Sequence, residues 1–127
     1  MPETLSILII DDEPSIRESL TEFLQDFDFE VHTAESAEEA LEMISNHDFK
    51  AAVVDLRLPG MSGESMILKA HALRPNMAFL IHTGSVDYRI SDALREIGVT
   101  AEHLFLKPLP DMTLLVEAVN RVVGLSV

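Results

Sequence analysis

Short apolar runs alternate along the whole chain with stretches of helical spacing, and this alternation constrains the fold more than any other feature. Residues 5–10, 51–54 and 78–81 are almost continuously apolar, as strands buried on both faces of a parallel sheet are. Residues 30–34 and 104–106 are weaker strand candidates. Apolar residues recur at helical spacing over residues 16–27, 37–44, 90–97 and 114–122, and more loosely over 63–73.

Local start and stop signals agree with this pattern. Pro14 suits the first turn of a helix, and Ser36 with Glu39 forms a capping box for the next one. Gly98 and Gly124 stand where the last two helices should end. The sequence therefore predicts five strands alternating with five helices, which is an α/β three-layer sandwich around a parallel sheet.

The chain has the size of one domain, and we expect residues 1–127 to form it, with a core over about residues 5–124. A domain of this length buries about two-thirds of the surface of its unfolded chain, so it needs no disulfide or structural metal. The absence of cysteine excludes disulfide scaffolds, cysteine-ligated metal sites and thiol catalysis.

The net charge of −13 is concentrated in the first part of the sequence. Residues 1–48 hold 14 acidic side chains and a single basic one, Arg17, whereas residues 49–127 are neutral. Nucleic-acid binding requires clustered Lys and Arg, so we expect no direct binding to nucleic acid and none to anionic membrane surfaces. No apolar run reaches the roughly 18–20 residues of a membrane span, and we expect a cytoplasmic protein.

Reactive side chains follow four of the predicted strands. In parallel sheets the ligand site lies at the carboxyl ends of the strands, so these side chains should share one edge. Each could also be structural, because acidic residues cap helices, Asp and Thr form turns, and Lys extends from buried strands to water. The residues are Asp11, Asp12 and Glu13, then Asp55, then Thr83 and Gly84, then Lys107 and Pro108.

Several carboxylates at one edge with a single lysine imply a bound cation. Two carboxylates about 4 Å apart repel by about 4 kcal/mol at an effective dielectric constant of roughly 20. Carboxylate ligands without His or Cys favour Mg²⁺ or Mn²⁺. A metal ion, a lysine and a threonine hydroxyl around a carboxylate are the components of phosphoryl transfer to an aspartate.

Four segments carry a resemblance to a known family. They are ILIIDDEPSIRESL near the start, VVDLRLPGMSGES in the middle, HTGS, and FLKP near the end. With them the sequence resembles a response-regulator receiver domain of bacterial two-component signalling, over essentially the whole chain. The resemblance implies a flavodoxin-like (βα)5 fold with strand order 2-1-3-4-5, and a phosphoprotein that accepts a phosphoryl group on an aspartate and then switches conformation to control an output partner.

The resemblance also implies which residues hold the metal ion. Asp55 would be the phosphoacceptor and a metal ligand. Asp11 and Asp12 would form the acidic pair, Asp12 holding Mg²⁺ directly and Asp11 mainly through water. The backbone carbonyl of Arg57 would be a further ligand.

Two more residues would contact the phosphoryl group. Thr83 would hydrogen-bond one of its oxygens, and Lys107 would pair with another. The Lys107–Pro108 peptide bond is expected to be cis. We also expect that a side chain in place of Gly84 would crowd an incoming phosphodonor.

The chain departs from the family before Lys107. Receivers usually carry Tyr or Phe three residues before the lysine, where this chain has Leu104, and strand alternation points Phe105 to the opposite face. Gly98 also stands two residues further from the lysine than is common. We therefore expect the activation signal to pass through movement of the loop after Thr83 without an aromatic ring switch.

The resemblance implies partners as well. A sensor histidine kinase or a phosphotransfer protein would supply the phosphoryl group. The neutral part of the chain, residues 49–127, supplies residues 90–97, 104–106 and 114–122, and the face that they form could serve a homodimer. Because the domain would catalyse only its own phosphorylation and dephosphorylation, we do not class it as an enzyme.

Two alternatives remain open from the sequence. A haloacid-dehalogenase-type phosphatase uses a similar residue set, but its nucleophile needs Asp two residues later, where Asp11 is followed by Glu13. A receiver-like module that acts by binding alone is the other alternative. The histidines show no metal-ligand spacing, and we interpret all of them as structural or surface residues: His32, His47, His71, His82 and His103.

Overall fold

The computed structural model describes residues 5–124, and the strands within this range form a single parallel sheet. The short tails of the expected domain, residues 1–4 and 125–127, lie outside the described residues. The strand order β2-β1-β3-β4-β5 confirms the flavodoxin-like prediction. The strands are β1 (Ser6–Ile10), β2 (Glu30–Ala34), β3 (Ala51–Val54), β4 (Ala78–Thr83) and β5 (Leu104–Leu106).

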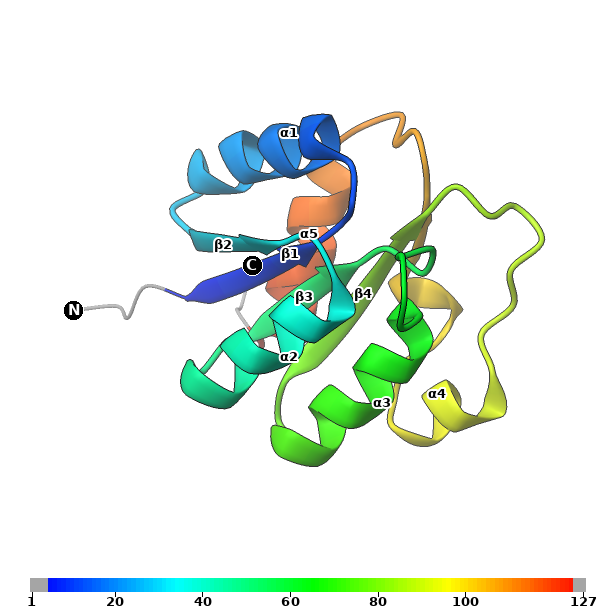
Figure 1. The fold of residues 1–127 in the computed structure, drawn as a ribbon. Helices are drawn as coiled ribbons and strands as arrows, with labels where there is room; N and C mark the ends of the chain where they lie inside the picture. The colour runs from blue at the N-terminus through cyan, green and yellow to red at the C-terminus, as the bar shows by residue number, and fades with distance from the viewer. Residues whose placement is uncertain (1–4, 125–127) are drawn as a thin grey trace.

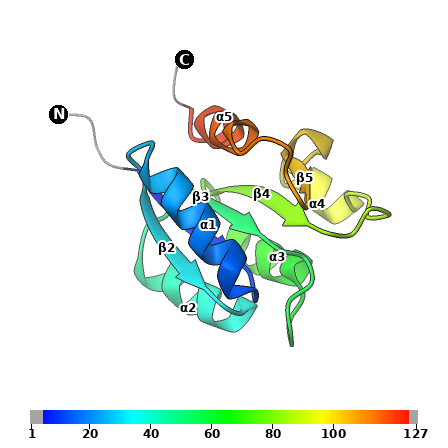
Figure 2. The same cartoon turned by 90° about the horizontal axis from the view of Figure 1, so that it is seen from above.

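The helices cover both faces of the sheet (Figures 1 and 2). Helices α1 and α5 pack on one face, and α2, α3 and α4 pack on the other, each over its own apolar cluster. This is the predicted three-layer sandwich. The helices are α1 (Pro14–Gln25), α2 (Ala37–Asn46), α3 (Gly63–Leu73), α4 (Asp92–Glu96) and α5 (Thr113–Val122).

The burial of each strand follows from its position in the sheet. Every residue of β1 and β3 is buried, as strands covered on both faces must be. Strands β2 and β5 lie at the edges and are partly exposed. Full burial of a Val, Leu or Ile side chain stabilises the fold by about 1.5–3 kcal/mol, so the central strands anchor the sheet.

Most of the predicted helix ends agree with the structure. Pro14 begins α1, and the Ser36 hydroxyl accepts the Glu39 N–H at 3.1 Å. The return bond of the capping box is displaced by one residue, because the Glu39 carboxylate accepts the N–H of Glu35 at 2.7 Å. Gly98, at φ +96°, follows the end of α4 in the left-handed conformation that glycine favours.

The region before β5 differs most from the expectation. The spacing over residues 90–97 predicts a helix of two turns, but α4 has only five residues because Ser91 caps it at Leu94 N–H. A short 3₁₀ turn, η1 (Ala101–His103), then precedes β5. This turn accommodates the longer spacing between Gly98 and Lys107, and β5 keeps its predicted bounds.

The register aligns the carboxyl ends of the strands. Ile10 of β1 pairs with Val54 of β3, and Thr83 of β4 pairs with Leu106 of β5. The residues that follow these strands therefore leave the sheet side by side. Within residues 5–124, none of the helices combines the length and apolar character that crossing a membrane would take.

Candidate functional site

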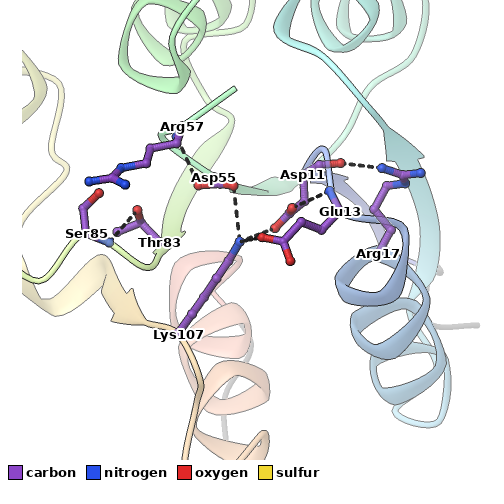
Figure 3. Close-up of polar contacts among 8 residues, drawn as sticks. All are labelled: Asp11, Glu13, Arg17, Asp55, Arg57, Thr83, Ser85 and Lys107. Atoms are coloured by element: carbon purple, nitrogen blue, oxygen red, sulfur yellow. Dashed lines mark hydrogen bonds and ion pairs between the residues drawn. The ribbon is translucent and has the colours of Figure 1, made fainter. Parts of the chain in front are cut away.

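The residues after β1, β3 and β5 meet at the carboxyl edge of the sheet (Figure 3). Asp11 follows β1, Asp55 follows β3 and Lys107 follows β5. Backbone bonds fix this alignment: Asp55 N–H donates to the Ile10 carbonyl at 2.9 Å, and Lys107 N–H donates to the Thr83 carbonyl at 2.8 Å. Side chains distant in the sequence thus begin from adjacent backbone positions.

Lys107 connects the acidic residues. Its Nζ donates to Asp11 Oδ2 at 2.8 Å and to Asp55 Oδ2 at 3.2 Å, and lies 3.7 Å from Glu13 Oε1. The side chains of Asp11 and Asp55 are 2% and 5% exposed, so both ion pairs are largely shielded from water. Burial alone would lower the pKa of Lys107, but the hydrogen bond and attraction to Asp11, with smaller contributions from Asp55, raise it.

Asp55 is held at both of its carboxylate oxygens. Oδ1 accepts the backbone N–H of Arg57 at 3.1 Å, while Oδ2 faces Lys107. Burial raises the pKa of Asp55, and the Arg57 N–H and the Lys107 charge only partly offset this. Burial therefore favours the protonated form of Asp55 despite the ammonium beside it.

Four carboxylates form a cluster around this position. Asp11, Asp12, Glu13 and Asp55 each offer one oxygen, and these oxygens all lie within 4.8 Å of one another. The set consists of hard oxygen donors, two of them on buried residues, and the Lys107 ammonium contacts it. Such a donor set fits Mg²⁺, which binds through one or two carboxylates and fills its other positions with water and phosphate oxygens.

Thr83 lies beside the acidic cluster at the end of β4. Its side chain is fully buried, and its hydroxyl oxygen accepts the N–H of Ser85 at 3.2 Å. The hydroxyl hydrogen remains available to another acceptor. Between the two residues, a Cβ built on Gly84 would have no atom within 4 Å, so the space in front of this loop is open.

The loop after β3 passes close to Asp55. A Cβ on Gly63, the first residue of α3, would lie 2.4 Å from the Asp55 carbonyl oxygen and 2.8 Å from Leu56 Cα. Only glycine permits this approach, which fixes the backbone of the loop against that of Asp55. Gly60, at φ +78°, provides the sharp turn between them.

Glu13 and Arg17 also take part in the site. Glu13 contributes an oxygen to the carboxylate cluster and faces Lys107. Arg17 donates from Nη1 to the Asp11 carbonyl at 2.7 Å, which fixes the backbone between β1 and α1. The sequence already places Glu13 among the carboxylates at this strand end, whereas no sequence signal pointed to Arg17.

The region of the missing aromatic residue has the predicted arrangement. Leu104 packs against the cluster under α2, α3 and α4, and Phe105 against the opposite cluster under α1 and α5. Tyr88, in the loop after β4, packs on the same side as Leu104 and donates its hydroxyl to Glu64 Oε1 at 2.9 Å. The Lys107–Pro108 bond is cis, which confirms the expectation.

Comparison with known proteins assigns a family to this geometry. The model of the response regulator receiver domain family matches residues 7–120. The transcriptional regulatory protein FixJ from Azorhizobium caulinodans is 31% identical over 126 residues, which is 99% of this chain and 58% of FixJ. This chain thus spans little more than half the length of that relative.

Solved structures agree with the match. A CheY-like response regulator receiver domain protein from Methanospirillum hungatei superposes with a TM-score of 0.79 at 31% identity, covering 94% of both chains. The response regulator protein TrrA from Thermotoga maritima, solved in complex with Mg²⁺ and BeF, gives a TM-score of 0.80 at 28% identity, covering 94% of this chain and 99% of TrrA.

Proposed function

Because this chain belongs to the response regulator receiver domain family, we propose that it accepts a phosphoryl group on Asp55 and thereby controls an output partner. One observation carries the proposal. The Asp55 carboxylate lies in a cluster of acidic oxygens, and the same carboxylate is 3.2 Å from the ammonium of Lys107. A nucleophile, a cation-binding donor set and a positive charge thus occupy one edge of the sheet.

Each of these side chains has a separate role in the proposed phosphoryl transfer. A carboxylate oxygen of Asp55 forms a bond to phosphorus as the bond to the nitrogen or oxygen of the donor breaks, and the electron pair leaves with the donor. Lys107 stays protonated and offsets charge on a phosphoryl oxygen. The buried Thr83 hydroxyl donates to another oxygen, and the open space at Gly84 admits the donor.

The acidic cluster fits a divalent cation, for which Mg²⁺ or Mn²⁺ are the candidates. Asp11, Asp12, Asp55 and the backbone carbonyl of Arg57 would hold it. When bound, the ion neutralises the phosphoryl oxygens that the carboxylates would otherwise repel. Lys107 already occupies one oxygen of Asp11, which supports the expectation that Asp12 contacts the ion more directly.

The conformational response would begin at Thr83. Movement of its hydroxyl toward a phosphoryl group would break the hydrogen bond from Ser85 N–H and displace the loop after β4. Phosphorylation then shifts an equilibrium between two arrangements of this loop. Leu104 replaces the usual ring, so the change would reach α4 through the loop itself.

The cellular context follows from the same proposal. A sensor histidine kinase or a phosphotransfer protein in the cytoplasm would donate the phosphoryl group, and the domain would catalyse no reaction on an external substrate. The face formed by α4, β5 and α5 comes from the neutral part of the chain, residues 49–127. It includes exposed apolar side chains at Leu106 and Leu114, each 42% exposed, and would serve a homodimer. The acidic first part of the chain disfavours direct contact with nucleic acid.

Beryllofluoride, an analogue of a bound phosphoryl group, tests the proposal without a donor protein. With Mg²⁺ present it should raise the melting temperature of the wild-type protein, because binding to the folded state alone stabilises it. Asp55→Asn should abolish the shift, whereas Asp26→Asn, an exposed aspartate at the end of α1, should leave it intact. A wild-type protein that shows no shift would instead support a module that works by binding alone.

A further inference from the structure

Two histidines and a glutamate meet beside the edge strand β2, away from the acidic cluster at the carboxyl ends of the strands. Glu30 and His32 belong to β2, and His47 is the residue that follows α2. Nε2 of His32 lies 2.9 Å from Oε2 of Glu30, and Nε2 of His47 lies 3.5 Å from the same oxygen. One ligand atom from each residue lies within 4.8 Å of the others.

The fold explains this meeting. Residues two apart on a strand point to the same face, so Glu30 and His32 project together from β2. Because β2 is an edge strand, their side chains stay partly open to solvent. Helix α2 then returns the chain to the start of β3 and brings His47 beside them, an approach that no spacing in the sequence reveals.

Neighbouring residues hold the three side chains in place. The ring of Phe49, 2% exposed, packs against His47 with centroids 4.6 Å apart and against His32 at 5.4 Å. The Ser6 hydroxyl donates to Glu30 Oε2 at 2.6 Å. Hydrogen bonds from Ser6 and His32 lower the pKa of Glu30, which favours its ionised form.

The separations fit a tetrahedral metal ion. Ligand atoms about 2.0–2.1 Å from a tetrahedral Zn²⁺ lie about 3.3 Å from one another. The distances from the two Nε2 atoms to Glu30 Oε2, 2.9 and 3.5 Å, fall on either side of this value. Small side-chain adjustments would therefore place all three ligand atoms around one ion.

We propose that Glu30, His32 and His47 form a binding site for a divalent transition-metal ion of the Zn²⁺ type. Two imidazole nitrogens and one carboxylate suit such an ion and are poor ligands for Mg²⁺. Coordination through Nε2 requires each neutral imidazole to carry its proton on Nδ1, which leaves the Nε2 lone pair for the ion. A surface hollow of about 410 Å³ that includes both histidines gives the ion access, and leaves a coordination position for water.

This site is separate from the proposed phosphorylation site. Ser6, the Cα partner of Glu30, begins β1, and Asp11 follows the other end of the same strand. At about 3.3 Å per residue, the length of β1 places the two sites well over 10 Å apart. The ion would link the edge strand β2 to the loop before β3, and its binding does not depend on Asp55.

Zinc titration by calorimetry tests the proposal on untagged protein, freed of metal by a chelator and supplied with excess Mg²⁺. We expect the wild type to bind one Zn²⁺ per chain. Losing a residue that merely supports a metal ligand costs about 10- to 100-fold in affinity, so His32→Gln and His47→Gln should each lose at least as much. His71→Gln, on α3 and outside the cluster, and Asp55→Asn should bind zinc as the wild type does.

Three results would overturn the proposal: no binding even with zinc in the millimolar range, unchanged affinity in both histidine variants, or loss of binding in Asp55→Asn. If a histidine variant fails to fold, Co²⁺ added to the wild type provides an independent test. The paramagnetic ion should broaden the imidazole resonances of His32 and His47 and spare those of His71 and His103. Equal broadening of all four would contradict the site.

Discussion

The ammonium of Lys107 lies 3.2 Å from a carboxylate oxygen of Asp55, although 52 positions separate the two residues. The same ammonium is 2.8 Å from Asp11, at the end of another strand. Lys107 therefore shares one positive charge between two buried carboxylates. A dianionic phosphoryl group on Asp55 would compete with Asp11 for that charge, so the pocket would rearrange when Asp55 is modified.

Asp55→Asn should stabilise the metal-free protein at neutral pH. Burial raises the pKa of Asp55, and a carboxyl group whose pKa is higher in the folded than in the unfolded state destabilises the fold once it is ionised. The melting temperature in EDTA should rise by a few degrees, which corresponds to about 1 kcal/mol in a domain of this size.

The pH dependence checks the cause of that effect. The difference between Asp55→Asn and wild type should shrink as the pH falls toward and below the ordinary aspartate value of 3.8, where the carboxyl group is protonated in both states. Added Mg²⁺ should also reduce the difference at neutral pH, because it stabilises only the wild-type cluster. A variant less stable than the wild type in EDTA at neutral pH would contradict this account.

Gly63→Ala should damage the site through the backbone. The added Cβ would lie 2.4 Å from the Asp55 carbonyl oxygen, and overpacking of this kind costs about 1–3 kcal/mol. Denaturant unfolding should show this loss, and beryllofluoride should bind more weakly. Gly84→Ala is the matched control, because its Cβ meets no atom within 4 Å and its unfolding free energy should change by less than about 0.5 kcal/mol. Equal stability of the two variants would refute the argument.

His82 should make the protein less stable as the pH falls from about 6.5 to about 4. Burial lowers its pKa to about 4, with a smaller contribution from the Lys107 charge, and its Nδ1 has no partner within the described residues. Because the unfolded state binds the proton first, stability falls by at most about 1.4 kcal/mol per pH unit in this window. His82→Gln should remove that slope relative to wild type. An equal loss of stability in the two proteins as the pH falls through this window would contradict the prediction.

Tyr88 should titrate at strongly alkaline pH. Burial, followed by the hydrogen bond to Glu64, raises its pKa to about 12. Tyr88 is the single tyrosine in a chain without tryptophan, so ultraviolet absorbance reads it directly. Glu64→Gln should lower this pKa. An unchanged titration would show that the hydrogen bond to Glu64 does not raise the pKa of Tyr88. The tyrosine fluorescence should also change on beryllofluoride binding if the loop after β4 moves as proposed.

Much of the candidate site could be predicted because ligand sites in parallel sheets lie at the carboxyl ends of the strands. Asp55 and Lys107 each end a short apolar run, and a parallel sheet must bring such ends to one edge. The order of the five strands came from the family resemblance. Hydrophobic periodicity could not supply it, because several strand orders are compatible with right-handed crossovers.

Other features depend on tertiary contacts that no local pattern encodes. The shortening of α4 is set by the Ser91 cap, and η1 is a single turn without its own apolar repeat. The approach of His47 to Glu30 and His32 requires the return of α2 along the sheet. Spacing rules for metal ligands find sites within one element, which is why the histidines looked unrelated in the sequence.

Location of the phosphoryl group on the chain tests the central claim most directly. The protein would be incubated with a small phosphodonor and Mg²⁺, treated with borohydride to reduce an acyl phosphate to an alcohol, and digested for mass spectrometry. We predict that Asp55 alone is converted to homoserine, and that omission of Mg²⁺ prevents the conversion. A phosphorylated wild-type chain in which Asp55 remains an aspartate, or a chain that takes up no phosphoryl group, would contradict the account.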